Sequence, residues 1–284
     1  MRIARTVTDL RREVATWRAR RERVGLVPTM GAIHAGHLAL VDAASGDNER
    51  VVASLFVNPK QFGPSEDFSS YPRDEAADLA AFEGAGVALV FMPPVEEMYR
   101  HGFATVVRVG GISEGLDGAF RPGHFEGVAT VVCKLLLQCL PDAAYFGEKD
   151  YQQLLVVRWM ARDLDIPVRI AGVPTVREAD GLALSSRNVR LSPDDRSRAL
   201  GLSRALTAAT AVVAAGERDA DRIREAAVAE LGDVEAEYLA IVDPLTFAPL
   251  RTVSARTLVA VAAQVGPVRL IDNVVLEPIP VATG

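Results

Sequence analysis

Short apolar runs alternate with amphipathic stretches over the first two thirds of the chain. The apolar runs have the usual length of buried strands, and the stretches between them repeat apolar residues at helical spacing. The predicted strands are residues 24–27, 51–57, 87–91, 143–146 and 168–173. The predicted helices are residues 37–44, 74–85, 125–140 and 151–164, two of which should end at Gly86 and Pro141. This alternation predicts the α/β class, with a Rossmann-like, doubly wound parallel sheet and helices on both faces.

The pattern changes after residue 175, where a polar loop rich in Gly, Ser and Arg begins. Ser192 then offers an N-cap before Pro193 and two acidic residues, a combination typical of a first helical turn. Two Ala-rich helices follow, and then three strand-like runs without helices between them, at residues 235–242, 257–263 and 269–276. We therefore expect a Rossmann-like domain over residues 1–175 and a smaller C-terminal α+β domain over residues 176–284.

The first 25 residues are rich in arginine, a composition that also occurs in transit peptides. Acidic residues are interspersed among the arginines, and no apolar segment of a signal sequence follows. Val7, Leu10, Val14 and Trp17 have helical spacing. We expect a surface helix here, with a targeting segment as the alternative.

Charge and composition narrow the class of ligand. The 31 basic and 37 acidic side chains give a formal net charge of −6, which opposes binding along a nucleic-acid backbone. No apolar run approaches the ~18 residues of a membrane span. Cys133 and Cys139 share one apolar segment and fit neither a disulfide framework nor a metal-ligand spacing. We expect them to be core residues of a cytoplasmic protein that binds neither nucleic acid nor a membrane.

Residues 28–37 follow the first predicted strand and open the next helix, which is the ligand end of an open α/β sheet. Helix-terminal N–H groups attract phosphate, Gly31 and Gly36 allow a ligand close to the backbone, and His34 and His37 can both face it. Two other interpretations remain open: ordinary surface histidines beside a turn, or a metal site that lacks further ligands. Neither a dinucleotide-binding glycine motif nor a P-loop occurs, so this motif is the candidate nucleotide site.

Two further clusters carry groups suited to phosphate. Residues 146–153 again join a strand end to a helix, where Gly147 permits close contact and Lys149 offers a positive charge. Residues 184–188 lie beyond the expected domain boundary and contribute two hydroxyls and a guanidinium that can clamp pyrophosphate. Each segment alone is also explained as a capped turn or a polar loop.

Two more segments suit a hydroxylated substrate or a helix entrance. Residues 56–63 follow another strand and carry neutral amides, which bind hydroxyls without adding charge, although a loop with Pro and Gly needs no such role. Residues 121–128 open the long helix, where Arg121 and His124 are either ligands or parts of its entrance.

Taken together, these clusters resemble the pantoate–β-alanine ligase (pantothenate synthetase) family. The matching segments occur in family order, at residues 28–37, 56–63, 71–73, 121–128, 147–153 and 185–188. The last third has the size and strand pattern of the family's lid domain, without a diagnostic motif. The resemblance implies the His-x-Gly-His nucleotidyltransferase superfamily, with ATP lying across the sheet, and a homodimer. It also implies Mg²⁺ as a bridge between phosphate oxygens, and the sequence does not identify the protein ligands of this ion.

The implied reaction has two steps. The carboxylate of pantoate attacks the α-phosphorus of ATP, which releases pyrophosphate and leaves pantoyl adenylate, and the amine of β-alanine then attacks the activated carbonyl. The resemblance places His34 and His37 against the phosphates, with His37 as the proton donor. It assigns the remaining phosphate grip to Lys149, Ser185, Ser186 and Arg187.

The resemblance also implies the contacts of each substrate. Gln61 and Gln153 would hold the hydroxyls and carboxylate of pantoate, while Pro28, Met30 and Phe62 cover its dimethyl group. Leu184 stands where the family commonly has Met, and we expect adenine packing to survive because the two volumes are similar. The other implied ATP contacts are Met30, Gly31, Gly36, Gly147, Glu148, Asp150 and Val176.

Three other functions compete with this interpretation. A different His-x-Gly-His adenylyltransferase would transfer AMP to a phosphorylated acceptor and would need a cationic pocket, against which the amides of residues 58–61 argue. A class I aminoacyl-tRNA synthetase shares the histidine motif, but this chain is short and acidic. A non-catalytic ATP sensor would not need His34, His37, Lys149 and Arg187 together.

Overall fold

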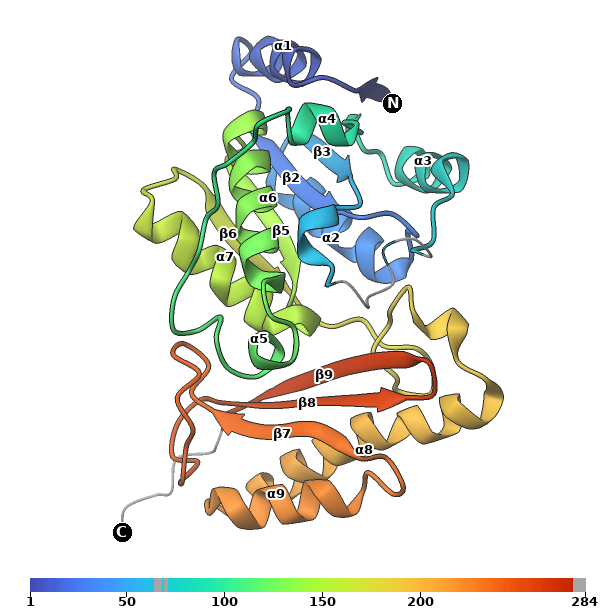
Figure 1. Ribbon diagram of the computed structural model, residues 1–284, viewed down its shortest axis with the longest axis vertical. Coiled ribbons are helices and arrows are strands. Elements are labelled where there is room, and N and C mark those ends of the chain that lie inside the picture. Colours follow the sequence, from blue (N-terminus) through green and yellow to red (C-terminus); the bar gives the residue numbers. More distant parts are fainter. Residues whose placement is uncertain (64–67, 69–70, 278–284) are drawn as a thin grey trace. The chain divides into compact units, whose positions relative to one another are not determined.

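The computed structural model describes residues 1–63, 68 and 71–277, and the chain divides into two compact units, Met1–Val176 and Arg177–Gly284 (Figure 1). The first unit contains a six-stranded sheet in the order β1-β4-β3-β2-β5-β6, with every neighbouring pair parallel. Its strands are β1 (Arg2–Ala4), β2 (Val24–Thr29), β3 (Arg50–Leu55), β4 (Leu89–Phe91), β5 (Ala143–Gly147) and β6 (Arg169–Val173). The predicted fold class is confirmed.

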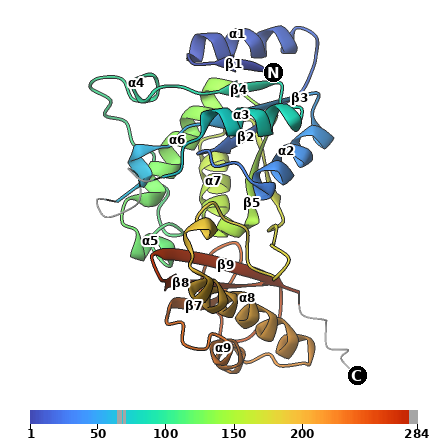
Figure 2. The same cartoon turned by 90° about the vertical axis from the view of Figure 1, so that its right-hand side faces the viewer.

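Helices cover both faces of this sheet, as a doubly wound fold requires. Buried residues of α2 and α3 form one apolar cluster with β2, β3, β4 and β5, while α6 and α7 pack together and contact β2 and β5. Figure 2 shows α2 and α6 on opposite sides of the sheet. The helices and 3₁₀ turns are α1 (Val7–Arg18), α2 (Ala35–Asp47), η1 (Pro59–Gln61), α3 (Glu75–Gly84), α4 (Val95–Met98), α5 (Asp117–Phe120), α6 (His124–Cys139), η2 (Glu148–Asp150) and α7 (Tyr151–Asp163).

The strand order places three of the predicted clusters side by side. The chain continues from β2 to β3 and β4 on one side, and β5 and β6 lie on the other, so the direction of winding switches between β2 and β5. Ligands of open α/β sheets bind at such a switch point, beyond the carboxyl ends of the strands. The segments that follow β3, β2 and β5 are residues 56–63, 30–37 and 148–153, and they therefore share one edge of the sheet.

Local signals explain where several elements begin and end. Gly86 adopts φ +77° after α3, and the N–H of Val87 donates to the Phe82 carbonyl (3.0 Å), which is the Schellman arrangement predicted by the glycine. In α1 the stripe Leu10, Val14 and Trp17 is buried, as its spacing predicts. Sequence reasoning missed β1, which has only three residues.

The second unit is a three-stranded antiparallel sheet with two helices, as expected for residues beyond the boundary. The Ser192 hydroxyl accepts the N–H of Asp195 (3.1 Å), so the predicted N-cap is confirmed. The elements are η3 (Asn188–Arg190), α8 (Pro193–Ala214), α9 (Ala220–Ala229), β7 (Ala236–Val242), β8 (Thr257–Val265) and β9 (Val268–Leu276).

Cys133 and Cys139 are unpaired and buried on α6, which confirms their predicted place in the core. Burial raises the pKa of the Cys139 thiol to about 12. Among the described residues, no helix combines the length and the hydropathy needed to cross a membrane.

Candidate active site

The two histidines of the motif cap the first turn of α2. His34 is the N-cap residue, and its Nδ1 accepts the N–H of Gly36 (3.1 Å). The Nδ1 of His37 accepts the N–H of His34 (3.4 Å), and the two rings stack with their centroids 4.1 Å apart. A neutral imidazole carries its hydrogen on one nitrogen and accepts with the other. Because Nδ1 accepts in both rings, both histidines present an Nε2–H donor.

The surroundings keep His37 uncharged. Burial is the main reason that its pKa falls from 6.5 to about 3, and the neighbouring charges of His34 and Lys149 lower it further, against an opposing effect of Asp150. His37 is therefore a neutral hydrogen-bond donor at neutral pH. The proton-donor role that the resemblance implies requires a bound anion to raise this pKa.

The main chain before the histidines is held by a carboxylate from α3. Gly31 and Ala32 have φ of +97° and +52°, both in the left-handed region. The side chain of Asp78 accepts the N–H of Ala32 (3.1 Å) and the N–H of Ile33 (2.8 Å). A Cβ on Gly31 would lie 2.8 Å from Asp78 Oδ2, so glycine is needed for the carboxylate to come this close.

A buried pair of amides follows β3. Asn58, which is 1% exposed, donates from Nδ2 to Gln61 Oε1 (3.0 Å) and to the Gly127 carbonyl (3.1 Å), and the Tyr99 hydroxyl donates to Asn58 Oδ1 (2.7 Å). These bonds fix the orientation of the Gln61 amide. Oε1 of Gln61 accepts from Asn58, and the Nε2 hydrogens can donate to a ligand.

The entrance of α6 supports this amide pair. The Nδ1–H of His124 donates to the Gln61 carbonyl (2.8 Å), and His124 Nε2 lies 3.0 Å from Arg121 Nη1, which donates to it. A Cβ on Gly127 would lie 2.2 Å from the Lys60 carbonyl oxygen, so η1 can pack on α6 only at a glycine. Of the two interpretations left open for His124, the structure supports a part in the helix entrance.

The segment after β5 brings Lys149 and Asp150 next to the histidine motif. The Lys149 Nζ lies 3.9 Å from Asp150 Oδ2, and both charges act on the pKa of His37. Glu148 packs against β6, where a Cβ on Gly172 would meet its Oε1 at 2.8 Å. Gly147 and Gln153 are half-buried.

The three residues predicted to cover the dimethyl group of pantoate, Pro28, Met30 and Phe62, are half-buried. Pro28 lies in β2 and Met30 directly follows this strand. The ring of Phe62 packs edge-on against Phe68 and Tyr71, with centroids 5.4 and 5.9 Å away. Val176 is half-buried at the end of the first unit.

The loop of residues 184–187 belongs to the second unit. The Ser185 hydroxyl accepts the N–H of Arg187 (3.3 Å). The buried Asn188 fixes the loop by donating to Glu178 Oε1 (2.6 Å) and to the Ala183 carbonyl (3.1 Å). Leu184, Ser185, Ser186 and Arg187 are half-buried.

Comparisons with known proteins decide the family. The family model for pantoate-beta-alanine ligase matches residues 2–275. The chain belongs to the pantoate–β-alanine ligase family. The resemblance inferred from the sequence is therefore confirmed.

Relatives and solved structures of this ligase family match nearly the whole chain. A pantothenate synthetase of Paramagnetospirillum magneticum is 54% identical over 278 residues, with 97% of this chain and 98% of the relative covered. A crystal structure of pantothenate synthetase from Thermus thermophilus is 53% identical, with a TM-score of 0.92 over 98% of this chain and 100% of that one. A Francisella tularensis pantoate-beta-alanine ligase, solved in complex with beta-gamma ATP and beta-alanine, is 30% identical, with a TM-score of 0.79 and 97% of each chain covered.

Sequence reasoning overlooked three residues whose hydrogen bonds to other segments help to hold the ligase motifs in place. Asp78 shares one face of α3 with Phe82, and a carboxylate on that buried face was the available signal. Gln152, which lies beside the predicted Gln153, is itself buried and donates to the carbonyls of Ile112 and Gly115 (2.8 Å each). Tyr99, which orients Asn58, carried no local signal.

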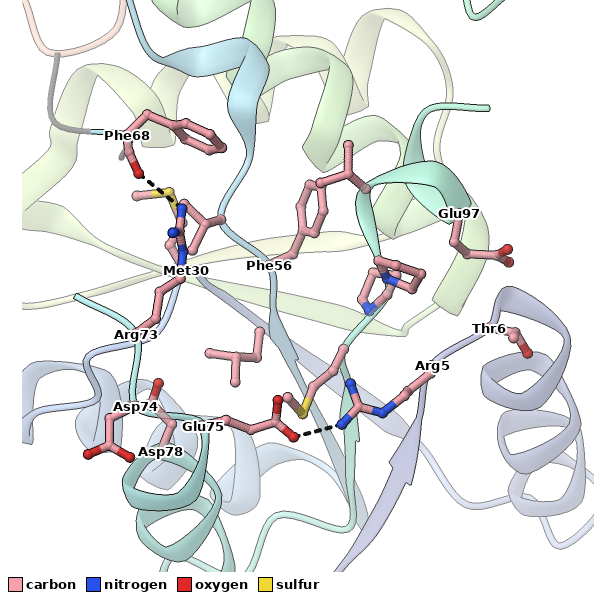
Figure 3. Close-up of a pocket in the computed structure, with 16 residues that line it drawn as sticks. Arg5, Thr6, Met30, Phe56, Phe68, Arg73, Asp74, Glu75, Asp78 and Glu97 are labelled. Carbon is pink, nitrogen blue, oxygen red and sulfur yellow. Dashed lines mark hydrogen bonds and ion pairs between the residues drawn. The ribbon is translucent and has the colours of Figure 1, made fainter. Parts of the chain in front are cut away.

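The first unit also contains a cavity of about 480 Å³ that is lined by residues of β3 and α3 among others (Figure 3). Its apolar lining includes Met30, Leu55 and Phe56, and Asp78 also lines it. The ion pair between Arg5 and Glu75 (2.6 Å) crosses part of its rim.

Proposed function

We propose that this chain joins pantoate to β-alanine through pantoyl adenylate, with release of AMP and pyrophosphate. The observation that carries the proposal is the pair of Nε2–H donors of His34 and His37, held at the switch point of the sheet beside Lys149 and the buried amides. Family membership and the ATP- and β-alanine-bound relative support the same chemistry.

The amides of Gln61 and Gln153 supply a site for pantoate. The Gln61 Nε2 hydrogens and the Gln153 amide bind its hydroxyls and carboxylate without a positive charge, so the carboxylate keeps its electron density for attack on phosphorus. Pro28, Met30 and Phe62 cover the dimethyl group. Holding the two reactants in line supplies much of the rate enhancement in such transfers.

The histidines and Lys149 stabilise the charge that moves toward pyrophosphate. Their donors are fixed before the reaction, so the protein need not reorganise as the bond to the α-phosphorus breaks. In the proposed reaction, Ser185, Ser186 and Arg187 of the second unit hold pyrophosphate and the unit acts as a lid. That assignment rests on the chemistry of hydroxyls and guanidinium and on the family resemblance.

The remaining contacts proposed for ATP involve the glycines of the histidine motif and a set of residues around its ribose and adenine. Gly31 and Gly36 allow the phosphates close to the helix terminus. The contacts proposed for ribose and adenine are Met30, Gly147, Glu148, Asp150, Val176 and Leu184.

We propose Mg²⁺ as the ion that accompanies ATP. Within residues 1–63, 68 and 71–277, no three His, Cys, Asp or Glu side chains are grouped as metal ligands. Asp150, whose carboxylate lies beside Lys149, would help to hold such an ion. Such an ion supplies neutralisation of phosphate charge.

We also propose a homodimer in the cytoplasm. The dimer rests on the family resemblance, and light scattering of the purified protein tests it. The location rests on two unpaired, buried thiols, and fractionation of cells tests it.

Pyrophosphate release from ATP tests the proposed function against its competitors. Release should require pantoate and should not require a phosphorylated acceptor. A sensor would release none, and another adenylyltransferase would need a different acceptor; either result would refute the proposal.

A further inference from the structure

The turn between β2 and α2 has an unusual backbone that must be stabilised from outside. Gly31 and Ala32 are both left-handed, and an L-residue such as Ala disfavours that region. The N–H groups of Ala32 and Ile33 lie in the turn between strand and helix, and the side chain of Asp78 accepts both. Its two oxygens thus replace the partners that secondary structure normally provides.

A single buried carboxylate, that of Asp78, makes this contact with the turn. The residue is 4% exposed and comes from α3, so its carboxylate reaches the turn across the packed face of that helix. The two acidic residues nearest to Asp78 along the chain have other partners, since Asp74 caps α3 at the N–H of Ala77 (3.0 Å) and Glu75 pairs with Arg5 (2.6 Å).

The constrained turn leads directly into the histidines. Ile33 precedes His34, which is the N-cap of α2, and the backbone N–H of His34 fixes the ring of His37. We infer that Asp78 is a positioning residue, which holds the turn so that both imidazoles keep the Nε2–H tautomer facing the phosphates. This inference rests on the proposed function only for the catalytic role of the histidines.

The substitution Asp78→Asn tests this with little change in volume. Asn keeps one acceptor but turns an NH₂ group toward a backbone N–H, so one of the two bonds is lost. Asp78 lines the cavity, which leaves room for the substituted side chain to adjust. Asp142→Asn is the matched control, because Asp142 accepts the N–H of Val24 (2.7 Å) at the opposite end of β2.

Two readouts separate positioning from simple destabilisation. Imidazole ¹H–¹⁵N spectra of the unliganded wild-type protein should show both histidines with hydrogen on Nε2, and Asp78→Asn should shift both toward mixed tautomers. Single-turnover formation of adenylate should fall about 100-fold, the scale of a small misplacement of catalytic groups, with the KM for pantoate unchanged. Asp142→Asn should leave the spectra and the rate as in wild type.

Unchanged imidazole signals in folded Asp78→Asn would overturn the inference, whether or not the rate falls, and so would mixed tautomers in Asp142→Asn. If Asp78→Asn does not fold, Asp78→Glu serves as the second variant, with the same shift expected because its oxygens lie one methylene further out. If wild type forms no adenylate, the proposed function fails, while the spectra still decide the role of Asp78.

Discussion

The rings of His34 and His37 stack with centroids 4.1 Å apart, and each Nδ1 accepts a backbone N–H of the same helix turn. Each histidine therefore takes part in capping α2 and carries its remaining N–H on Nε2. This relationship ties the protonation of the pair to the geometry of the turn, since protonation of either Nδ1 would break a capping bond.

The low pKa of His37 predicts a pH dependence of stability. In the unfolded chain the group titrates near 6.5, and in the folded protein near 3, so the unfolded state binds the extra proton between these values. Stability should therefore fall as pH decreases from about 6.5 toward 3, by up to about 1.4 kcal/mol per pH unit from this group. Chemical denaturation of wild type and His37→Gln between pH 7 and 4 measures the difference. Parallel pH profiles would show that His37 is not held neutral.

Removing charge stabilisation should slow the chemical step more than it weakens ATP binding. His37→Ala and Lys149→Ala should each reduce single-turnover adenylate formation by roughly 10²–10³, because their donors act on charge that develops as the bond breaks. Calorimetry should show a much smaller change in ATP affinity. Cys133→Ala is the control, since this buried thiol should affect stability only.

The amides of Gln61 and Gln153 should act on pantoate and leave ATP binding intact. Gln61→Ala or Gln153→Ala should weaken pantoate use by roughly 1–3 kcal/mol, the cost of leaving a buried polar group without its partner. Steady-state kinetics with pantoate and calorimetry with ATP separate the two effects. An equal loss of ATP affinity would show that the amides do not form a separate substrate subsite.

Gly127 links the fold to the amide site. In Gly127→Ala the new methyl would meet the Lys60 carbonyl oxygen at 2.2 Å, which should displace η1, cost roughly 1–3 kcal/mol of stability and raise the KM for pantoate. Gly84→Ala is the control, because a Cβ there meets nothing within 4 Å and should leave both quantities near wild type. Thermal unfolding and pantoate kinetics of the two variants check this, and equal behaviour would contradict the packing argument.

Much of the fold was predictable because its signals are local. The stripe of Leu10, Val14 and Trp17, the glycine after α3 and the cap at Ser192 each depend on a few adjacent residues. The strand β1 was missed because three residues show no periodicity, and its pairing with β4 joins segments far apart in the chain.

The motifs of the candidate site could be predicted from the sequence, but the residues that hold them in place could not. His34 and His37 can be recognised from their spacing in the sequence. The roles of Asp78, Tyr99 and Gln152 depend on contacts between segments that are distant in the chain. Gln152 and Gln153 look alike in sequence, and only the packing of α7 separates the buried anchor from its half-buried neighbour.

Rapid-quench analysis of wild-type protein with ATP, Mg²⁺ and pantoate tests the central claim most directly. Activation and amide formation are separate steps, so pantoyl adenylate and pyrophosphate should accumulate on the enzyme before β-alanine is added. Addition of β-alanine should then convert the adenylate to pantothenate and AMP. If no adenylate forms and pyrophosphate appears only when β-alanine is present, the account is contradicted.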